Sequence, residues 1–306
     1  MRVIAKIFLS LMVLAAGASA AGAEELTAGD LFPPFGKFGE AGDNYKDQAV
    51  VTDVYQAVLS ALKGSGVPES YVKAAFADPR VKIHEEIVTA MNKPAESLTY
   101  EQYKKLLLTE KRIAGGVQFY NANKDLLAAV SQKYGVDALV LTGLVGVESS
   151  YGENKGKYLV FNALNTIGER IPRRSAWAAR EIAELLKLSY SRRKDPFALL
   201  GSYAGAFGLG QFMPSSYNAY AVDFDGDAYP DLFAWPDALA SISNYLVKHD
   251  YFSAPGFAEG SGPWKALYGY NHSANYVNVI LELRLEIQKR LSAAAHVPAA
   301  TRSARP

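Results

Sequence analysis

The stretch LVLTGLVGVESSYGENKGKY at residues 139–158 begins with an almost wholly apolar part, and this part carries one carboxylate, Glu148, near its end. Asp137 is a typical N-cap residue, so the pattern predicts a helix that begins directly after it and ends at SSYG. One and two turns before Glu148, the same face of this helix carries apolar residues only, namely Leu141, Leu144 and Val145. The sequence therefore places an acid where an unpaired charge is expensive to bury.

Two explanations of Glu148 follow from the residue types. A partly buried glutamate can pair with an arginine, and IPRR at 171–174 offers candidates. Alternatively, burial and the negative end of the helix dipole both disfavour the anion and raise the pKa of the carboxyl group, as a general acid requires. The residue types alone leave both explanations open.

Composition excludes several classes of function. The chain has 306 residues, 49% of them hydrophobic, and a formal net charge of +1, so no basic excess would follow a nucleic-acid backbone. The absence of cysteine excludes a disulfide framework, a thiol nucleophile and attachment through a lipoprotein cysteine. The four histidines lack zinc-ligand spacing, and no G-x-S-x-G sequence is present. Acid chemistry on a glycosidic bond fits best among ordinary hydrolase layouts.

The N-terminus has the pattern of an export signal. Positive residues precede the apolar run IFLSLMVLAAGA, and small residues typical of a cleavage site follow it. We therefore predict a signal peptide over 1–23 and, because Gly, Pro and Asp dominate the next segment, an irregular leader over 24–48.

The rest of the chain has mainly helical periodicity. We predict a helical N-terminal part over 49–120, a core over 121–292 and a disordered tail over 293–306. Helices are expected around 53–63, 68–76, 82–91, 99–112, 121–135, 137–149 and 175–189, from Pro236, and from Ala274 to about Ser292.

A second informative stretch is GSYAGAFGLGQFMPSSY, residues 201–217. Its glycines, at 201, 205, 208 and 210, let the backbone approach another element or a ligand closely. Ser202 and Gln211 add a hydroxyl and an amide among apolar neighbours. These residues favour either a wall that binds the acetamido group of a sugar or tight packing against a helix.

The segments GVESSYG, PRR, GSYAGAFGLGQFMPSSYNAYAVDFDGD and YNHSANY, in this order, resemble membrane-bound lytic murein transglycosylase B and its relatives, glycoside hydrolase family 103. The similarity runs from about Tyr103 to Tyr276 and is densest over 143–250. The resemblance implies a mainly α (α+β) fold. In that fold a lysozyme-like core carries additional helical N-terminal and C-terminal parts and a small β/loop insertion. It also implies a periplasmic protein, soluble or peripherally associated with the membrane.

The same resemblance implies a peptidoglycan lytic transglycosylase. Such enzymes cleave the β-1,4 bond between N-acetylmuramic acid and N-acetylglucosamine and form 1,6-anhydromuramoyl products without adding water. The catalytic acid falls on Glu148, which would act first as acid and then as base, with no cofactor. Peptidoglycan strands are the implied partner, with wall-synthesis proteins as further candidates, a monomer favoured and no nucleic acid. The alternatives are a hydrolytic muramidase and a non-catalytic peptidoglycan-binding protein.

Carried over position by position, the resemblance also implies a set of substrate-binding residues: Ser202, Gln211, Phe212, Tyr103, Arg173, Arg174, Tyr245, Tyr270, Asn271 and Tyr276. Trp177 stands where the family carries a tyrosine, so this position keeps an aromatic ring but loses a hydroxyl.

The third stretch is DFDGDAYPDLFAWPD, residues 223–237, whose first acids match the first ligand positions of an EF-hand loop. The resemblance implies a structural calcium ion that is bound by the carboxylates of Asp223, Asp225, Asp227 and Asp237 and the carbonyl of Tyr229. Ala228 occupies the loop position that is usually glycine, where a positive φ costs more. The loop therefore bends differently or binds weakly, and a solvated acidic turn is the alternative.

Overall fold

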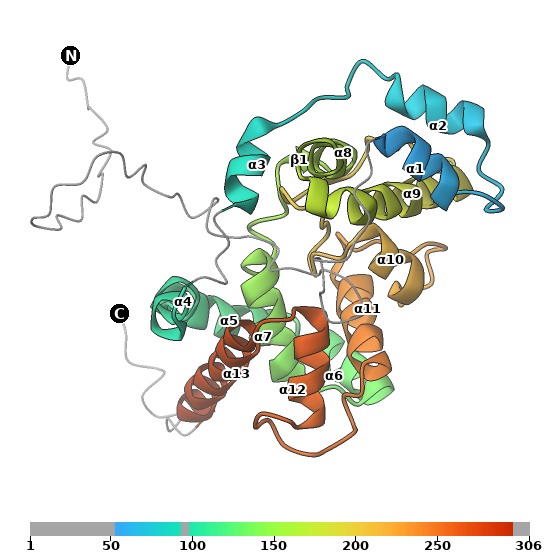
Figure 1. Cartoon of the computed structure of the whole chain (residues 1–306). Helices are drawn as coiled ribbons and strands as arrows, with labels where there is room; N and C mark the ends of the chain where they lie inside the picture. Colours follow the sequence, from blue (N-terminus) through green and yellow to red (C-terminus); the bar gives the residue numbers. More distant parts are fainter. Residues whose placement is uncertain (1–52, 93–97, 296–306) are drawn as a thin grey trace, which may run out of the picture.

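A computed structural model describes residues 53–92 and 98–295, which form a mainly helical protein (Figure 1). The predicted signal peptide and leader, residues 1–48, lie outside the described residues. The helices in chain order are α1 (Val54–Ala61), α2 (Glu69–Phe76), α3 (Glu85–Met91), α4 (Tyr100–Leu107), α5 (Glu110–Ala122), α6 (Lys124–Tyr134), α7 (Ala138–Ser149), α8 (Val160–Arg170), the 3-10 helix η3 (Pro172–Arg174), α9 (Ser175–Ser191), α10 (Pro214–Tyr220), α11 (Trp235–Lys248), α12 (Gly262–Tyr270) and α13 (Ala274–Ala295).

The helices differ from the sequence-based prediction in several places: α8, α10 and α12 were not expected, and two boundaries are different. The single helix expected over 99–112 is wrong, because the backbone leaves the helical region at Leu108 (φ −96°, ψ 61°). Thr109 then starts α5, and its hydroxyl accepts a hydrogen bond of 3.2 Å from the N–H of Arg112. At the other end, α13 continues to Ala295, so residues 293–295 are helical and not part of a disordered tail.

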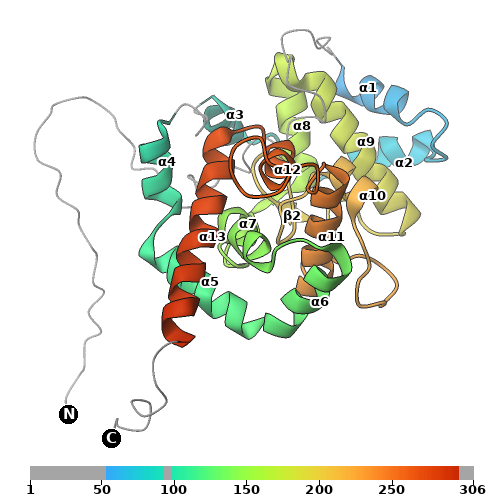
Figure 2. The ribbon, with the colours of Figure 1, turned by 90° about the horizontal axis from the view of Figure 1, so that it is seen from below.

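Helix α7 lies at the centre of one half of the molecule. It packs against α5, α6, α11 and α13, which surround it when the molecule is seen from below (Figure 2). Every residue from Val140 to Ser149 is buried. A helix that is apolar on all sides has to be enclosed in this way, because any exposed face would leave apolar surface in water.

The other half of the molecule is built on α8 and α9. These two helices pack against each other, α1 packs against both, and α3 packs against α8 (Figure 1). The helices α1 to α3 therefore cover the core segments that follow Glu148 in the chain.

A small sheet connects the two halves. Strand β1 (Tyr158–Leu159) pairs antiparallel with β2 (Leu200–Gly201), and the register places Tyr158 opposite Gly201. The chain then folds back on itself through bridges from Phe207 to Gly201 and to Phe212. We call residues 200–212 the β2 hairpin. It corresponds to the predicted β/loop insertion.

In neither of the two described segments is there a helix whose length and apolar content would let it cross a lipid bilayer.

Candidate active site

Glu148 lies in the last turn of α7, and the local sequence explains how this helix forms. The carboxylate of Asp137 accepts hydrogen bonds from the N–H groups of Leu139 (2.8 Å) and Val140 (2.9 Å), which satisfies donors at the helix start. The surrounding helices leave Glu148 only 8% exposed. The predicted burial of this acid is therefore confirmed.

A tyrosine from the opposite end of the chain orients the acid. The hydroxyl of Tyr276, on α13, donates a hydrogen bond of 2.6 Å to Oε1 of Glu148. Burial and, after it, the charge of Glu148 raise the pKa of Tyr276 well above its ordinary value. The phenol therefore keeps its proton at neutral pH and acts as a donor that fixes the carboxyl group of Glu148.

The end of α7 is capped by a buried cation that the sequence analysis did not single out. Nε of Arg112 donates to the carbonyl of Gly146 (2.9 Å), and Nη2 donates to the hydroxyl of Ser150 (3.1 Å). Nη1 donates to the carbonyls of Leu106 (3.2 Å) and Leu107 (2.7 Å) at the end of α4. Burial lowers the pKa of Arg112. This guanidinium compensates the negative ends of two helices directly beside the acid.

The β2 hairpin carries Ser202 and Gln211. The N–H of Ser202 donates to the carbonyl of Ala206 (2.8 Å), and its hydroxyl accepts from the N–H of Ala206 (3.1 Å). Gln211 has a positive φ of 52°, and its Nε2 donates to the carbonyl of Gly208 (3.0 Å). Both side chains are buried and form internal hydrogen bonds, so the hairpin presents them in fixed positions.

The glycines of this hairpin are explained by packing. A Cβ atom at any of them would lie between 2.2 and 2.9 Å from the nearest atom of a neighbouring residue. These neighbours are Ala206 (at Gly201), Leu164 (at Gly205), Leu232 (at Gly208) and Ile242 (at Gly210). Of the two interpretations of the glycines, tight packing is therefore confirmed.

An aromatic cluster joins the hairpin to the surroundings of the acid. Phe212 lies 5.9 Å from the ring of Tyr270 and 6.2 Å from that of Tyr245, measured between ring centroids. The hydroxyl of Tyr270 donates to the carbonyl of Gly210 (2.6 Å). Burial raises the pKa of Tyr270, and the charge of Glu148 adds to this effect. The cluster is thus continuous with the acid in space.

The structure therefore brings together many of the residues proposed from sequence. The buried group comprises Glu148, Tyr276, Tyr270, Tyr245, Phe212 and Tyr103, the last of which acts electrostatically on the phenol of Tyr276. Asn271 directly follows Tyr270 and is 1% exposed, and its Nδ2 has no hydrogen-bond partner among the described residues.

The arginine pair belongs to a different element from the acid. Arg173 and Arg174 belong to η3, between α8 and α9, where Arg173 is exposed and Arg174 half-buried. Trp177 follows on α9 and is 3% exposed. For these three residues a role in substrate binding stays a prediction.

The four predicted metal ligands converge. Asp223, Asp225, Asp227 and Asp237 each offer a carboxylate oxygen, and these oxygens lie within 4.8 Å of one another. Loss of hydration and the nearby charges of Asp237 and Asp227 raise the pKa of Asp225. Such a set of oxygen donors fits a hard cation such as Ca²⁺, which would relieve the repulsion between the carboxylates.

The backbone of this loop also follows the expectation for position 228. Ala228 adopts a φ of 107°, a strained conformation for a residue with a Cβ atom. Asp237, which is 1% exposed, accepts hydrogen bonds from the N–H groups of Phe224 and Asp231, both at 2.7 Å. Asp237 therefore holds the loop in place through these hydrogen bonds. Binding of a metal ion by the carbonyl of Tyr229 stays a prediction.

Comparison with known proteins agrees with this arrangement. The sequence profile of the family described as "Transglycosylase SLT domain" matches residues 51–259. The chain is 39% identical over 150 residues to membrane-bound lytic murein transglycosylase B of Escherichia coli K12. That match covers 49% of this chain and only 42% of the E. coli protein.

Solved structures share the fold. The soluble lytic transglycosylase SltB1 of Pseudomonas aeruginosa superimposes with a TM-score of 0.68 at 29% identity, over 78% of this chain and 99% of that one. The E. coli lytic transglycosylase Slt35 in complex with bulgecin A gives a TM-score of 0.67 at 25% identity, over 81% and 96% of the two chains. The mainly helical, lysozyme-like fold expected from sequence is thus confirmed, and the extent of the profile match shows that the chain belongs to the transglycosylase SLT domain family.

Proposed function

We propose that this protein is a peptidoglycan lytic transglycosylase. It cleaves the β-1,4 bond between N-acetylmuramic acid and N-acetylglucosamine and leaves a 1,6-anhydromuramoyl end. The observation that carries the proposal is the buried Glu148, held at 2.6 Å by Tyr276, in a chain of the transglycosylase SLT domain family. The names of its relatives, which are lytic transglycosylases, agree with it.

The first chemical step requires one protonated carboxyl group. Tyr276 donates to Oε1 of Glu148, and in the proposed step the other carboxyl oxygen delivers the proton to the glycosidic oxygen. The proton passes to that oxygen, the bond from C1 to the leaving sugar breaks, and Glu148 becomes a carboxylate. The acetamido group of the muramoyl residue stabilises the cationic carbon, as in substrate-assisted glycosidases.

The second step returns the carboxyl group to its first state. The carboxylate of Glu148 takes the proton of the C6 hydroxyl group while O6 forms a bond to C1 of the same sugar. The nucleophile belongs to the substrate, so its effective concentration is high and no water is consumed. This proton transfer leaves Glu148 protonated again, so that the next turnover can begin.

The remaining site residues would bind the glycan. Ser202, Gln211 and Asn271 offer polar groups, and the predicted aromatic residues beside them, Phe212, Tyr103, Tyr245 and Tyr270, are buried and would contact the glycan only through the edges that a bound sugar reaches. Arg173 and Arg174 would bind more distant carboxylate or acetamido groups of the substrate, and Trp177 supplies a ring without the hydroxyl. We place this activity in the periplasm, where the peptidoglycan strands that it cleaves are found.

Substitution of the acid tests the proposal. Glu148→Gln keeps the size of the side chain but removes the transferable proton, so we expect release of anhydromuropeptides from purified sacculi to fall by about 10²- to 10⁴-fold. Glu153→Gln is the control, because Glu153 is exposed and pairs with Lys111 at 2.9 Å.

Mass spectrometry of the products separates the alternatives. A transglycosylase gives products lighter by one water than the reducing muropeptides that a hydrolytic muramidase releases. Full activity of Glu148→Gln would contradict the role of Glu148. Binding to sacculi without any turnover by the wild-type protein would favour the non-catalytic alternative.

We also propose a structural calcium ion at the four aspartates. The ion would stabilise the loop 223–237 and the start of α11 and would take no part in the reaction. At a calcium concentration of 100 times Kd, we expect the free energy of unfolding to rise by about 2.7 kcal/mol. Asp225→Asn should abolish this gain, since Asp225 is exposed and does not share the structural hydrogen bonds of Asp237. An unfolding curve that is unchanged by millimolar calcium or by a chelator would contradict this assignment.

A further inference from the structure

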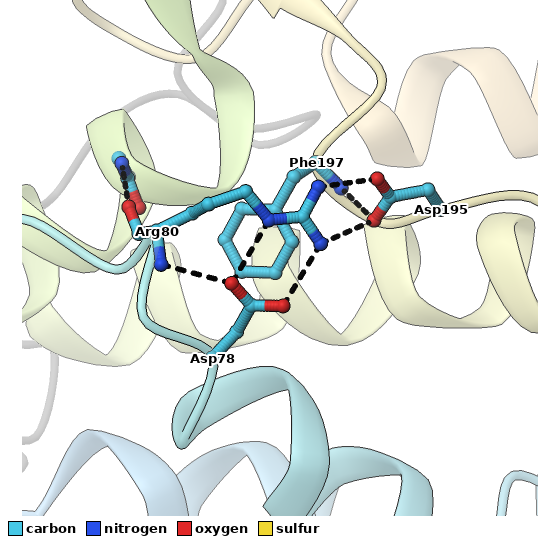
Figure 3. Close-up of polar contacts among 5 residues, drawn as sticks. Asp78, Arg80, Asp195 and Phe197 are labelled. Carbon is cyan, nitrogen blue, oxygen red and sulfur yellow. Dashed lines mark hydrogen bonds and ion pairs between the residues drawn. The ribbon is translucent and has the colours of Figure 1, made fainter.

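Arg80 lies between two carboxylates from distant parts of the chain (Figure 3). Its Nε and Nη2 donate to the two oxygens of Asp78, at 2.9 and 2.8 Å. Its Nη1 and Nη2 donate to the two oxygens of Asp195, at 2.5 and 3.1 Å. Both contacts are bidentate, which requires the planar fork of an arginine and which a lysine cannot reproduce.

Two further contacts fix Arg80 to the core. The guanidinium carbon lies 4.5 Å from the centroid of the Phe197 ring, which is 4% exposed and packs on Phe161 at 4.8 Å (Figure 3). The carbonyl of Arg80 accepts a hydrogen bond of 2.9 Å from Nδ2 of Asn162, on α8. Both ends of the arginine are therefore anchored.

The segment that Arg80 binds leads directly into the β2 hairpin. Oδ1 of Asp195 accepts from the N–H of Phe197 (3.1 Å), and its carbonyl accepts from the N–H of Ala198 (3.0 Å). The carbonyl of Leu199 then accepts from the N–H of Val160 (3.0 Å), and β2 begins at the next residue. Ser202 lies at the end of this short hydrogen-bonded path.

The same N-terminal segment also contacts the partner strand. The ring of His84 meets the ring of Tyr158, on β1, edge-on at 5.2 Å. The N–H of His84 donates to the hydroxyl of Thr166 (3.1 Å), on α8. Residues 78–84 thus contact β1 directly, through Tyr158, and contact the segment that leads into β2, through Asp195 and Phe197.

We propose that Arg80 is a positioning residue that holds the β2 hairpin, and with it Ser202 and Gln211, in the arrangement that binds the glycan. The consequence for catalysis rests on the proposed function. The effect on the hairpin is independent of the proposed function. Arg80 and Asp195 have side chains that are 47% and 44% exposed. Exposed ion pairs of this kind add little to global stability, so the role of Arg80 lies in local geometry.

The ion pairs are present over the whole working range of pH. Hydrogen bonds from Arg80 lower the pKa of Asp78 to about 2 and also lower the pKa of Asp195. A carboxyl group whose pKa is lowered by folding stabilises the folded protein fully at pH values above its pKa in the unfolded chain, which is near 4. This stabilisation is lost as the pH falls toward 2. Between pH 5 and 8 the ion pairs of the wild-type protein are therefore intact, and a difference between the wild-type protein and a variant reports the substitution itself.

The test compares Arg80→Ala and Arg80→Lys with a matched control. Arg290 is 46% exposed and forms a bidentate pair with Glu110, with both contacts at 2.7 Å, far from the hairpin in sequence. Arg290→Ala therefore removes a similar surface pair without touching residues 195–212. Both alanine variants should show similar small changes in global unfolding.

The decisive measurement is hydrogen exchange of the hairpin amides. In Arg80→Ala the exchange rates of the N–H groups of Ser202, Ala206 and Phe207 should rise about three- to tenfold, whereas Arg290→Ala leaves them unchanged. Arg80→Lys should recover only part of the protection, because it lacks the bidentate geometry. Equal exchange rates in Arg80→Ala and Arg290→Ala would overturn the proposal.

A kinetic measurement then tests the consequence for catalysis. We expect kcat/KM for glycan oligomers to fall about tenfold in Arg80→Ala, mainly through KM, since Ser202 and Gln211 bind substrate. An unchanged kcat/KM with faster exchange would refute the link to substrate binding and leave the proposed function intact. If the wild-type protein released no muropeptides, the proposed function would fail, and hydrogen exchange would still decide the role of Arg80.

Discussion

The most demanding prediction concerns Gly156, which lies between the end of α7 and β1. Its φ is +88°, and a Cβ atom there would lie 2.0 Å from both the carbonyl carbon and the oxygen of Gly201 and 2.5 Å from the nitrogen of Ser202. All three are backbone atoms, so no side chain can rotate away. To restore ordinary contact at 3.4 Å, the backbone at Gly201 has to move by about 1.4 Å, the difference from 2.0 Å, and the nitrogen of Ser202 by about 0.9 Å, the difference from 2.5 Å.

Gly156→Ala should therefore impair activity more than stability. A displacement of about 1 Å at a substrate-binding group costs about 10²-fold in rate, and we expect a loss of this size in kcat/KM. Overpacking should lower the free energy of unfolding by about 1–3 kcal/mol, and the left-handed backbone adds about 1–2 kcal/mol. Urea unfolding and muropeptide release from sacculi measure the two effects separately.

The chain offers a matched control for the backbone effect. Gly256 has the same φ of +88°, but a Cβ atom there meets nothing within 4 Å. Gly256→Ala should therefore lose only the left-handed backbone contribution of about 1–2 kcal/mol and retain full activity. If the two variants had the same stability and the same activity, the steric argument for Gly156 would be refuted.

Three further outcomes are expected. Arg112→Ala leaves two buried carbonyl groups and one half-buried carbonyl group without this donor, so the free energy of unfolding, measured in urea, should fall by about 3 kcal/mol or more. Tyr276→Phe removes the donor to Glu148 and should lower kcat about 10- to 100-fold, with the fold retained by circular dichroism. Burial and, after it, the charge of His249 lower the pKa of His272 from its ordinary value of 6.5, so the unfolded chain binds a proton at this residue more readily than the folded protein does. The contribution of His272 to the free energy of unfolding is therefore fully present above pH 6.5 and declines as the pH falls below it. His272→Asn should therefore weaken the loss of stability between pH 6.5 and 5, measured in urea at both values.

The helix of Glu148 could be predicted because its signals are local. Asp137 marks the start of α7, and the apolar run after it requires enclosure. The acids at 223, 225 and 227 were likewise found from their spacing, whereas Asp237 was implied by the family resemblance, and the four carboxylates converge. In both cases a short stretch of sequence contains the information.

Other features depend on contacts between distant residues and could not be found in this way. Nothing in the local sequence distinguishes Arg112 from other helical arginines, because its partners, the carbonyls of Gly146 and Leu107, come close to it only in the folded protein. No glycine or proline precedes the helix break at Leu108, so the sequence does not predict the end of α4. The only local signal is Thr109, the N-cap residue of α5. Arg80 is an exposed residue whose partner, Asp195, follows 115 positions later.

The enclosure of α7 has a consequence for how this protein fails under heat. The acid is on a helix whose residues from Val140 to Ser149 are all buried, and such a helix opens only when the whole core opens. Ser202, in contrast, directly follows a two-residue strand, and the segment before this strand is held at the surface by the exposed ion pair of Arg80 and Asp195. On warming, the strand should come loose well before the core. A heated sample can then keep the full circular-dichroism signal of its helices after its enzymatic activity is lost. An activity assay would therefore detect thermal inactivation at a lower temperature than circular dichroism would.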